Sequence, residues 1–314
     1  MEPLKIATVQ FETRDNDKVY NLSIIREMCR KASVEGADVV AFHECSVCGY
    51  TFAKDLSRKN CCYCRTDPHG GEYASLIAIA KEFWRHATGG FFERDGDRIY
   101  KAQVCVDGNG LKAKYRKLHP FINPNILPGD QYVVFEIKGW KCGILICYDN
   151  NIIENVRCHG LIRGGYHFHA SRDDVYPFPS PRAGLINPML WENRANDPTS
   201  LRQEFDGLKG RAWLMKWLPA RRTTMRYMWY SPIRSGRDYN EIKNGCSMIL
   251  DPFGDIVAEC RKLGDDFVIA TAIPEKLRQA GGYRYRNARR PELYADIIGQ
   301  PHESNQKEHV NRNT

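Results

Sequence analysis

The feature that most constrains the fold is the alternation of element types over residues 5–42. KIATVQF at 5–11 is an apolar strand, residues 21–36 have apolar side chains at helical spacing and end at Gly36, and ADVVAF at 37–42 is a second strand. A strand, helix and strand in succession predict a right-handed crossover that joins two parallel strands. We therefore expect an α/β fold.

The rest of the chain continues this mixture of strands and helices. Glycines at the centre of two segments indicate tight hairpins, the first at Asp107-Gly108-Asn109-Gly110 and the second at Lys138-Gly139. Further elements are expected downstream: a helical stretch at 201–221, a hairpin about Pro252-Phe253-Gly254 within 244–260, and a late strand at 265–273.

Length and composition favour one large domain. The chain has 314 residues, 42% of them hydrophobic, which is enough for a single core, and no linker divides it. We expect a domain over residues 1–298 and a polar C-terminal tail over 299–314. No run is long enough for a membrane span and no signal peptide is evident, so a cytoplasmic protein is expected.

Charge and cysteine content exclude two other classes. The net charge of +8 comes from basic residues spread along the chain, without a recognition module, so no nucleic-acid partner is expected. Twelve cysteines are present, but Cys105, Cys142, Cys147 and Cys246 lie in apolar stretches typical of reduced, buried thiols. No disulfide framework is predicted.

Three apolar segments each end in a reactive side chain. GADVVAFHE ends at Glu44, AKYRK at Lys117 and GWKCGILIC at Cys147. Open α/β folds place their chemistry where strands end. A thiolate attacks carbonyl or nitrile carbon, and it needs a neighbouring base or cation because a free thiol is mostly protonated at neutral pH. Singly, each residue is better explained as packing or surface charge.

Together the three residues form a candidate catalytic set. Glu44 is the candidate acid and base, which accepts the thiol proton and returns it to the leaving amine. Lys117 is the candidate cation that stabilises negative charge on the carbonyl oxygen, with backbone N–H groups near Cys147. Cys147 is the candidate nucleophile.

The sequence around these residues resembles the nitrilase superfamily of carbon–nitrogen hydrolases. The motifs that carry the resemblance are Glu44 with Gly49 and Tyr50, then Tyr115-Arg116-Lys117, then Cys147-Tyr148-Asp149 with Glu154 and Arg157. NGCSMILDPFGDI and the RRPELY near Arg290 extend it to about residues 4–298. The resemblance implies a four-layer α-β-β-α sandwich, a homodimer or higher homo-oligomer, and no metal or cofactor.

The implied activity is hydrolysis of non-peptide C–N bonds through a cysteine thioester. A small amide is the first candidate substrate, and an N-carbamoyl amide or a nitrile is the alternative. Two features depart from the family pattern: His43 replaces the usual Pro, and Ile152-Ile153 replaces Phe-Pro. A second Glu is usual in the loop after the Lys, but residues 119–129 contain no acid.

The residues that bind the substrate are therefore predicted from their position alone. Tyr50, His119, Asn123 and Tyr148 are the candidates, and Asn125 is a further one. His119, Asn123 and Asn125 can hydrogen-bond an amide, or they can serve only to structure their loop.

Four windows do not follow the expected pattern. Residues 158–180 contain three His, two Arg and two Asp where the fold needs a buried strand, and they show no strand periodicity. Read one base out of frame, with synonymous codons chosen freely, this window gives a family-like apolar strand. Windows 61–69, 84–90 and 222–235 also give family-like sequences when they are read one base out of frame. We hypothesise out-of-frame translation, which leaves open an inactive relic that does not fold as written.

The same windows contain apparent metal ligands. Cys61, Cys62, Cys64 and His69 resemble a zinc cluster, and His167 with His169 a ligand pair. The paired spacing of a structural zinc site is missing, so no metal is predicted.

Overall fold

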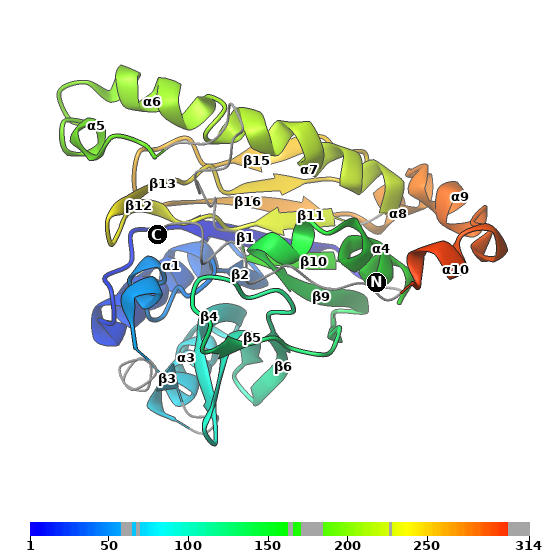
Figure 1. Ribbon diagram of the computed structural model, residues 1–314, viewed down its shortest axis with the longest axis horizontal. Coiled ribbons are helices and arrows are strands. Elements are labelled where there is room, and N and C mark those ends of the chain that lie inside the picture. Colours follow the sequence, from blue (N-terminus) through cyan, green and yellow to red (C-terminus); the bar gives the residue numbers. More distant parts are fainter. Residues whose placement is uncertain (58–64, 67–69, 163–165, 171–184, 226–227, 301–314) are drawn as a thin grey trace.

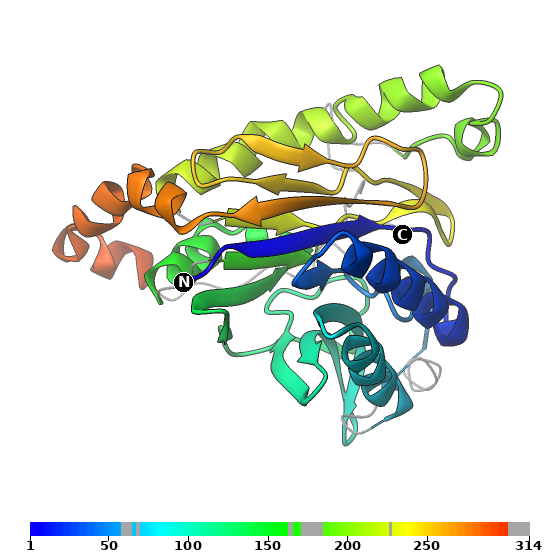
Figure 2. The same ribbon diagram turned by 180° about the vertical axis from the view of Figure 1, so that it is seen from behind.

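The computed structural model describes residues 1–57, 65–66, 70–162, 166–170, 185–225 and 228–300. Two sheets lie face to face, with helices on the two outer sides (Figures 1 and 2). The predicted four-layer α-β-β-α architecture is confirmed.

The first sheet is ordered β16-β1-β2-β4-β5-β6, with β3 paired to β4 and β7 to β5. Its strands are β1 (Leu4–Gln10), β2 (Val39–Ala41), β3 (Arg65–Thr66), β4 (His86–Asp95), β5 (Arg98–Asp107), β6 (Gly110–Arg116), β7 (Ile126–Leu127) and β16 (Asp266–Ala272).

The second sheet is ordered β15-β14-β11-β10-β9-β8, and a separate hairpin joins β12 to β13. These strands are β8 (Val134–Ile137), β9 (Trp140–Ile146), β10 (Tyr166–Ala170), β11 (Met228–Ser231), β12 (Ser235–Asp238), β13 (Glu241–Asn244), β14 (Met248–Leu250) and β15 (Ile256–Glu259).

Helices cover both outer faces. They are α1 (Lys18–Val34), α3 (Gly71–Phe83), α4 (Ile153–Leu161), α5 (Pro188–Glu192), α6 (Pro198–Asp206), α7 (Arg211–Met225), α8 (Pro274–Gln279), α9 (Gly282–Asn287) and α10 (Ala295–Ile298), with 3-10 turns η1 (Thr51–Asp55), η3 (Cys147–Asn150) and η4 (Pro291–Leu293). In Figure 1, α1 and α3 lie on the opposite side of the sheets from α6 and α7.

Alternation along the strands separates the apolar side chains into two cores. Leu4 and Ile6 of β1 pack in the core that also holds Ile144 of β9 and Leu214 of α7. Ala7 and Val9 belong to the core under α1 and α3. A strand with apolar residues on both faces is what a sandwich with outer helices requires.

Several local predictions are confirmed. β1 and β2 are parallel, with Ile6 opposite Val39. β5 and β6 form the first predicted hairpin. β8 and β9 form the second, whose turn residues Lys138 and Gly139 have φ of 49° and 77°.

The predicted helix at 201–221 is instead two helices, α6 and α7. The break falls at Gly207–Gly210, where Gly207 has an extended backbone (φ −74°, ψ −166°) and a Cβ at Gly210 would lie 2.3 Å from the Phe205 carbonyl oxygen. Glycine at this position allows the chain to approach its own backbone closely.

The expectation that residues 158–180 contain no strand is wrong. β10 lies inside the second sheet, parallel to β9 and β11. Tyr166 and Phe168 alternate with His167 and His169, and this period of two was outweighed by the count of polar residues. Ladder hydrogen bonds come from the backbone, so they do not depend on which side chains the strand carries. The other windows also contain strands: β3, the start of β4, and β11.

The domain over residues 1–298 and the tail over 299–314 stay predictions. α10 ends at Ile298, and residues 301–314 lie outside the described residues. Within the described ranges, no helix combines the length and apolar character that crossing a membrane requires.

Candidate active site

Glu44 lies in a loop that follows β2 and packs on β4. The Val47 amide donates to the Gly90 carbonyl at 3.0 Å, and the Gly90 amide donates to Ser46 Oγ at 3.2 Å. A Cβ at Gly90 would lie 2.5 Å from the Cys45 amide nitrogen, so only glycine lets the loop approach this closely. The backbone around Glu44 is therefore held from both sides.

The Glu44 carboxylate is buried against two ammonium groups. Lys117 Nζ donates a hydrogen bond of 2.9 Å to Glu44 Oε1, and Lys101 Nζ lies 2.9 Å from the same oxygen. Glu44 is 3% exposed, and both lysines are 0% exposed. The second oxygen, Oε2, is also buried and has no hydrogen-bond partner among the described residues. One oxygen is thus held by two cations while the other remains open.

These contacts fix the ionisation of Glu44. Burial alone would raise the pKa of this carboxyl, but the ammonium groups of Lys101 and Lys117 outweigh burial and lower its pKa to about 2. Burial in turn lowers the pKa of Lys101, and the Glu44 charge opposes that change. Glu44 is therefore a carboxylate at neutral pH, as an acceptor of a thiol proton must be.

Hydrogen bonds to Asp149 join the segment around Lys117 to the turn that contains Cys147. Its Oδ2 accepts a hydrogen bond of 2.7 Å from Tyr115 Oη, two residues before Lys117. Its Oδ1 accepts from the His119 amide at 2.8 Å, two residues after Lys117. Since Asp149 belongs to the same 3-10 turn as Cys147, Lys117 lies in a loop bound on both sides to the turn of the thiol.

Cys147 directly follows β9 and has a left-handed backbone, with φ of 48°. A residue with a side chain pays about 1–3 kcal/mol for such a conformation, and outliers of this kind cluster at functional sites. Cys147 is 7% exposed. The turn after it is secured by Arg221 of α7, which donates to the carbonyl oxygens of Asn150 and Asn151.

Three of the predicted substrate-binding residues have hydrogen-bond partners within the protein. Asn123 Nδ2 donates to the carbonyl oxygens of Ala53 and Leu56, both at 2.8 Å, and its Oδ1 accepts from Asn125. His119 Nδ1 lies 3.0 Å from Asp149 Oδ1. These contacts fix the loop after Lys117 and favour the structural alternative for Asn123, Asn125 and His119.

The two predicted tyrosines differ from each other. Tyr50 is 1% exposed, and its ring centre lies 3.6 Å from Lys101 Nζ. Tyr148 is only partly buried and lies edge-on to Phe121, whose ring centre is 5.1 Å from Lys117 Nζ. Of the pair, Tyr148 is therefore the more exposed.

Sequence analysis did not predict the role of Lys101 or Asp149. Lys101 lies in a buried stretch of β5, and strand alternation puts it on the same face as Gln103 and Cys105. A lysine in such a run is the signal that could have identified it. Asp149 was recognised only as part of the Cys-Tyr-Asp motif, because its hydrogen bonds depend on packing between elements far apart in sequence.

The apparent metal ligands stay untested. Cys61, Cys62, Cys64 and His69 lie outside the described residues, and the same holds for the side chains of His167 and His169. In the described part of the chain, no group of three His, Cys, Asp or Glu residues could hold a metal.

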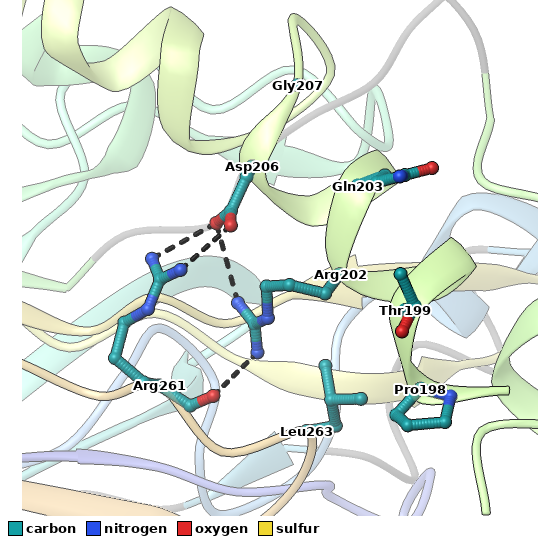
Figure 3. A pocket seen from close by; sticks show the side chains of 8 residues that line it. All are labelled: Pro198, Thr199, Arg202, Gln203, Asp206, Gly207, Arg261 and Leu263. Atoms are coloured by element: carbon teal, nitrogen blue, oxygen red, sulfur yellow. Dashed lines mark hydrogen bonds and ion pairs between the residues drawn. The ribbon is translucent and has the colours of Figure 1, made fainter.

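A pocket of about 770 Å³ lies elsewhere, between α6 and the segment before β16 (Figure 3). Arg261 pairs with Asp206 at 2.8 Å, and Arg202 lies 3.6 Å from Asp206 and donates to the Arg261 carbonyl at 2.7 Å. Glu44, Lys117 and Cys147 do not line it. Because its charges are paired with each other, this pocket is not a second candidate site.

Comparison with known proteins identifies one family. The model of the carbon-nitrogen hydrolase family matches residues 5–180. A nitrilase from Pyrococcus abyssi is 30% identical over 66% of this chain and 78% of its own length. A citrullinase from Francisella tularensis is 26% identical over 95% of this chain and 99% of its own length.

Solved structures share the fold. A mutant of an amidase of the nitrilase superfamily from Nesterenkonia AN1 superposes with a TM-score of 0.69, at 18% identity, over 93% of this chain and 96% of the amidase. A second mutant of that amidase, with the same score, carries the acetamide moiety of fluoroacetamide covalently added at its active-site cysteine.

Proposed function

This chain belongs to the carbon–nitrogen hydrolase family, and from that premise we propose that it hydrolyses small amides with Cys147 as nucleophile, Glu44 as acid and base, and Lys117 as the stabilising cation. The observation that carries this proposal is the buried hydrogen bond between Glu44 and Lys117. The loop that contains Lys117 is in turn hydrogen-bonded to Asp149, which lies in the same turn as Cys147.

The first half of the reaction forms a thioester. Glu44 accepts the proton of the Cys147 thiol, and the sulfur attacks the amide carbon to form a C–S bond. The Lys117 ammonium stabilises the negative charge that develops on the carbonyl oxygen. The C–N bond then breaks, and the nitrogen leaves as ammonia with the proton from Glu44.

The second half releases the acid. Glu44 takes a proton from water, and the hydroxide attacks the thioester carbon. The C–S bond breaks, the carboxylic acid leaves, and Cys147 regains its proton. No cofactor or metal takes part in these steps.

The test is ammonia release from a panel of substrates. We expect turnover of short aliphatic amides by the purified protein, and no turnover by Cys147→Ala, because no other described group replaces the thiol. Ammonia release at an equal rate from Cys147→Ala would reject the assignment of the nucleophile.

Several substrate classes occur among the names of the relatives. The relatives include proteins named nitrilase, (R)-stereoselective amidase and citrullinase. N-carbamoyl amides and nitriles therefore belong in the same panel as alternatives. Preferred turnover of either one over aliphatic amides would change the substrate and keep the thioester chemistry.

An inactive relic is the competing proposal, and the polar windows favour it. β10 lies inside the second sheet, yet two of its five residues, His167 and His169, are polar. Burying such groups without partners costs several kcal/mol, against a total stability of about 5–15 kcal/mol. Sequencing the transcript tests the out-of-frame hypothesis, because an uninterrupted frame that encodes these residues ends it.

A homodimer or higher homo-oligomer in the cytoplasm completes the proposal. Apolar side chains are exposed near the C-terminal end of the domain, with Tyr285 and Leu293 each 58% and Ile297 74% exposed. Exposed apolar groups of this density favour burial against another subunit. Sedimentation of a monomer at micromolar concentration would contradict the oligomer.

A further inference from the structure

Lys101 is a charged side chain in the interior of the first sheet. It comes from the middle of β5 and is 0% exposed. Its Nζ lies 3.6 Å from the centre of the Tyr50 ring, a cation–π distance, and 2.9 Å from Glu44 Oε1. The side chain is therefore held between an aromatic face and the carboxylate.

Burying an ammonium group costs free energy, so the presence of this one calls for an explanation. Replacing buried ionic groups by apolar residues of similar volume is often neutral or stabilising. Lys117 already provides Glu44 with a hydrogen-bonded cation at 2.9 Å. One cation is enough to neutralise one carboxylate. The Lys101 ammonium is therefore not needed for charge neutralisation.

The second ammonium restricts the orientation of the Glu44 carboxylate. Both cations lie on Oε1, so rotation of the carboxylate would separate two ion pairs. Oε2 is left buried without a hydrogen-bond partner among the described residues. This open oxygen is the one free to exchange a proton.

We propose that Lys101 is a positioning residue for Glu44, which holds Oε1 together with Lys117, keeps the carboxylate ionised in its buried site, and leaves Oε2 open for proton transfer. This inference rests on the proposed function of Glu44. Lys101 acts through Glu44 and needs no contact with the substrate.

The charged and titratable groups around Glu44 come from three segments. His43 and Cys45 flank it in its own loop, with the His43 ring bonded to the Glu44 carbonyl oxygen. Lys101 enters from β5, and Lys117 from the loop that follows β6. His43 stays neutral over the working range, because burial lowers its pKa to about 4. Removing Lys101 leaves Lys117 as the only cation paired with Glu44 in the described structure.

The experiment compares two lysines of the same hairpin. Lys101→Met removes the buried ammonium, and Lys114→Met removes an ammonium from Glu93, a second buried carboxylate with two cations. For both variants and the parent, kcat/KM for a short aliphatic amide and the rate of Cys147 alkylation by iodoacetamide are measured from about pH 5 to pH 9.

We expect an acid limb to appear in Lys101→Met only. Loss of one cation lets burial raise the pKa of Glu44, so that kcat/KM falls about tenfold for each pH unit below the new limb. The alkylation rate should fall over the same range. The parent and Lys114→Met should share one profile. Lys101→Arg, which keeps the charge, should restore the parent profile at least in part.

Two outcomes separate this inference from the proposed function. A folded Lys101→Met with the parent's pH profile in both assays would overturn the role of Lys101 and leave amide hydrolysis intact. Failure of the parent to hydrolyse any substrate would overturn the proposed function, and the alkylation profiles would still decide for Lys101. If Lys101→Met does not fold, the profile of Tyr50→Leu, which removes the ring beside Lys101, must shift in the same direction for the inference to stand.

Discussion

Two buried carboxylates, one in β4 and one in the loop after β2, each bind two cations, but they bind them differently. Glu93 of β4 receives Lys114 on Oε1 at 2.5 Å and Arg116 on Oε2 at 2.7 Å, so both of its oxygens are occupied. The side chains of Lys114 and Arg116 are 29% and 24% exposed, so water shares their charge.

Glu44 has the opposite arrangement. Its two lysines are fully buried and share Oε1, and Oε2 has no partner in the described ranges. Satisfied oxygens and exposed cations are typical of a structural ion cluster, whereas an open oxygen in a desolvated site is typical of an acid or base. Each cluster contains one carboxylate and two cations, so residue types alone do not separate a structural cluster from a catalytic one. The placement of the cations on one oxygen or on both does separate them.

The largest expected effect comes from neutralising the two carboxylates in turn. Glu44→Gln should lower kcat/KM by about 10²–10⁴, since the amide cannot accept the thiol proton. Glu93→Gln should change kcat/KM less than about threefold, because that carboxylate is structural. Steady-state kinetics of the two variants test this. Equal losses would show that the two clusters do not differ in function.

The cations give the next largest contrast. Lys117→Met should lower kcat by about 10²–10³ through loss of the charge that stabilises the carbonyl oxygen. Lys114→Met should leave kcat near that of the parent. If Lys117→Met raised KM alone, Lys117 would bind the substrate without stabilising the transition state.

A third contrast concerns stability. Asp149→Ala removes the acceptor of the buried Tyr115 Oη and of the partly buried His119 amide, and a buried donor left unpaired costs about 1–3 kcal/mol. Asp95 also accepts from Arg116, but the Asp95 side chain is 53% exposed. Asp95→Ala should therefore lower the free energy of unfolding by less than about 1 kcal/mol. Urea unfolding compares them. A small loss in Asp149→Ala would mean that Asp149 does not hold the two segments together.

The smallest expected effect is on the pH dependence of unfolding. The pKa of Glu44 is lowered from 4.5 to about 2 in the folded state, so this group stabilises the fold above about pH 4.5 and loses that contribution as pH falls toward 2. Glu44→Gln should therefore lose less unfolding free energy than the parent between about pH 5 and pH 3. Equal losses would place the pKa of Glu44 near its ordinary value.

Much of the fold follows from local sequence patterns. The parallel pair of β1 and β2 follows from the strand, helix and strand at 5–42, and the hairpins follow from their glycines, because turn chemistry and side-chain period act over few residues. β10 was missed, because the polar residues of its window outweighed the alternation of Tyr166 and Phe168 with His167 and His169, and the neighbours β9 and β11 supply its backbone ladder. The break at Gly210 was missed because it depends on how closely Phe205 approaches.

The candidate site was predictable in its types of residue and not in its contacts. Glu44, Lys117 and Cys147 could be identified because each follows an apolar strand. The pairing of Lys101 with Glu44 and the bonds of Asp149 join residues far apart in sequence, so only the fold reveals them. Asn123 was identified by its amide, yet that amide bonds to the backbone of Ala53 and Leu56.

The most direct test of the account is the intact mass of the protein after brief incubation with a reactive amide. The account predicts an added acyl group, located on Cys147 by peptide mapping, that disappears with time as ammonia and acid accumulate, and that never forms on Cys147→Ala. Ammonia release without an acyl group on Cys147, or with the group on another residue, would contradict it.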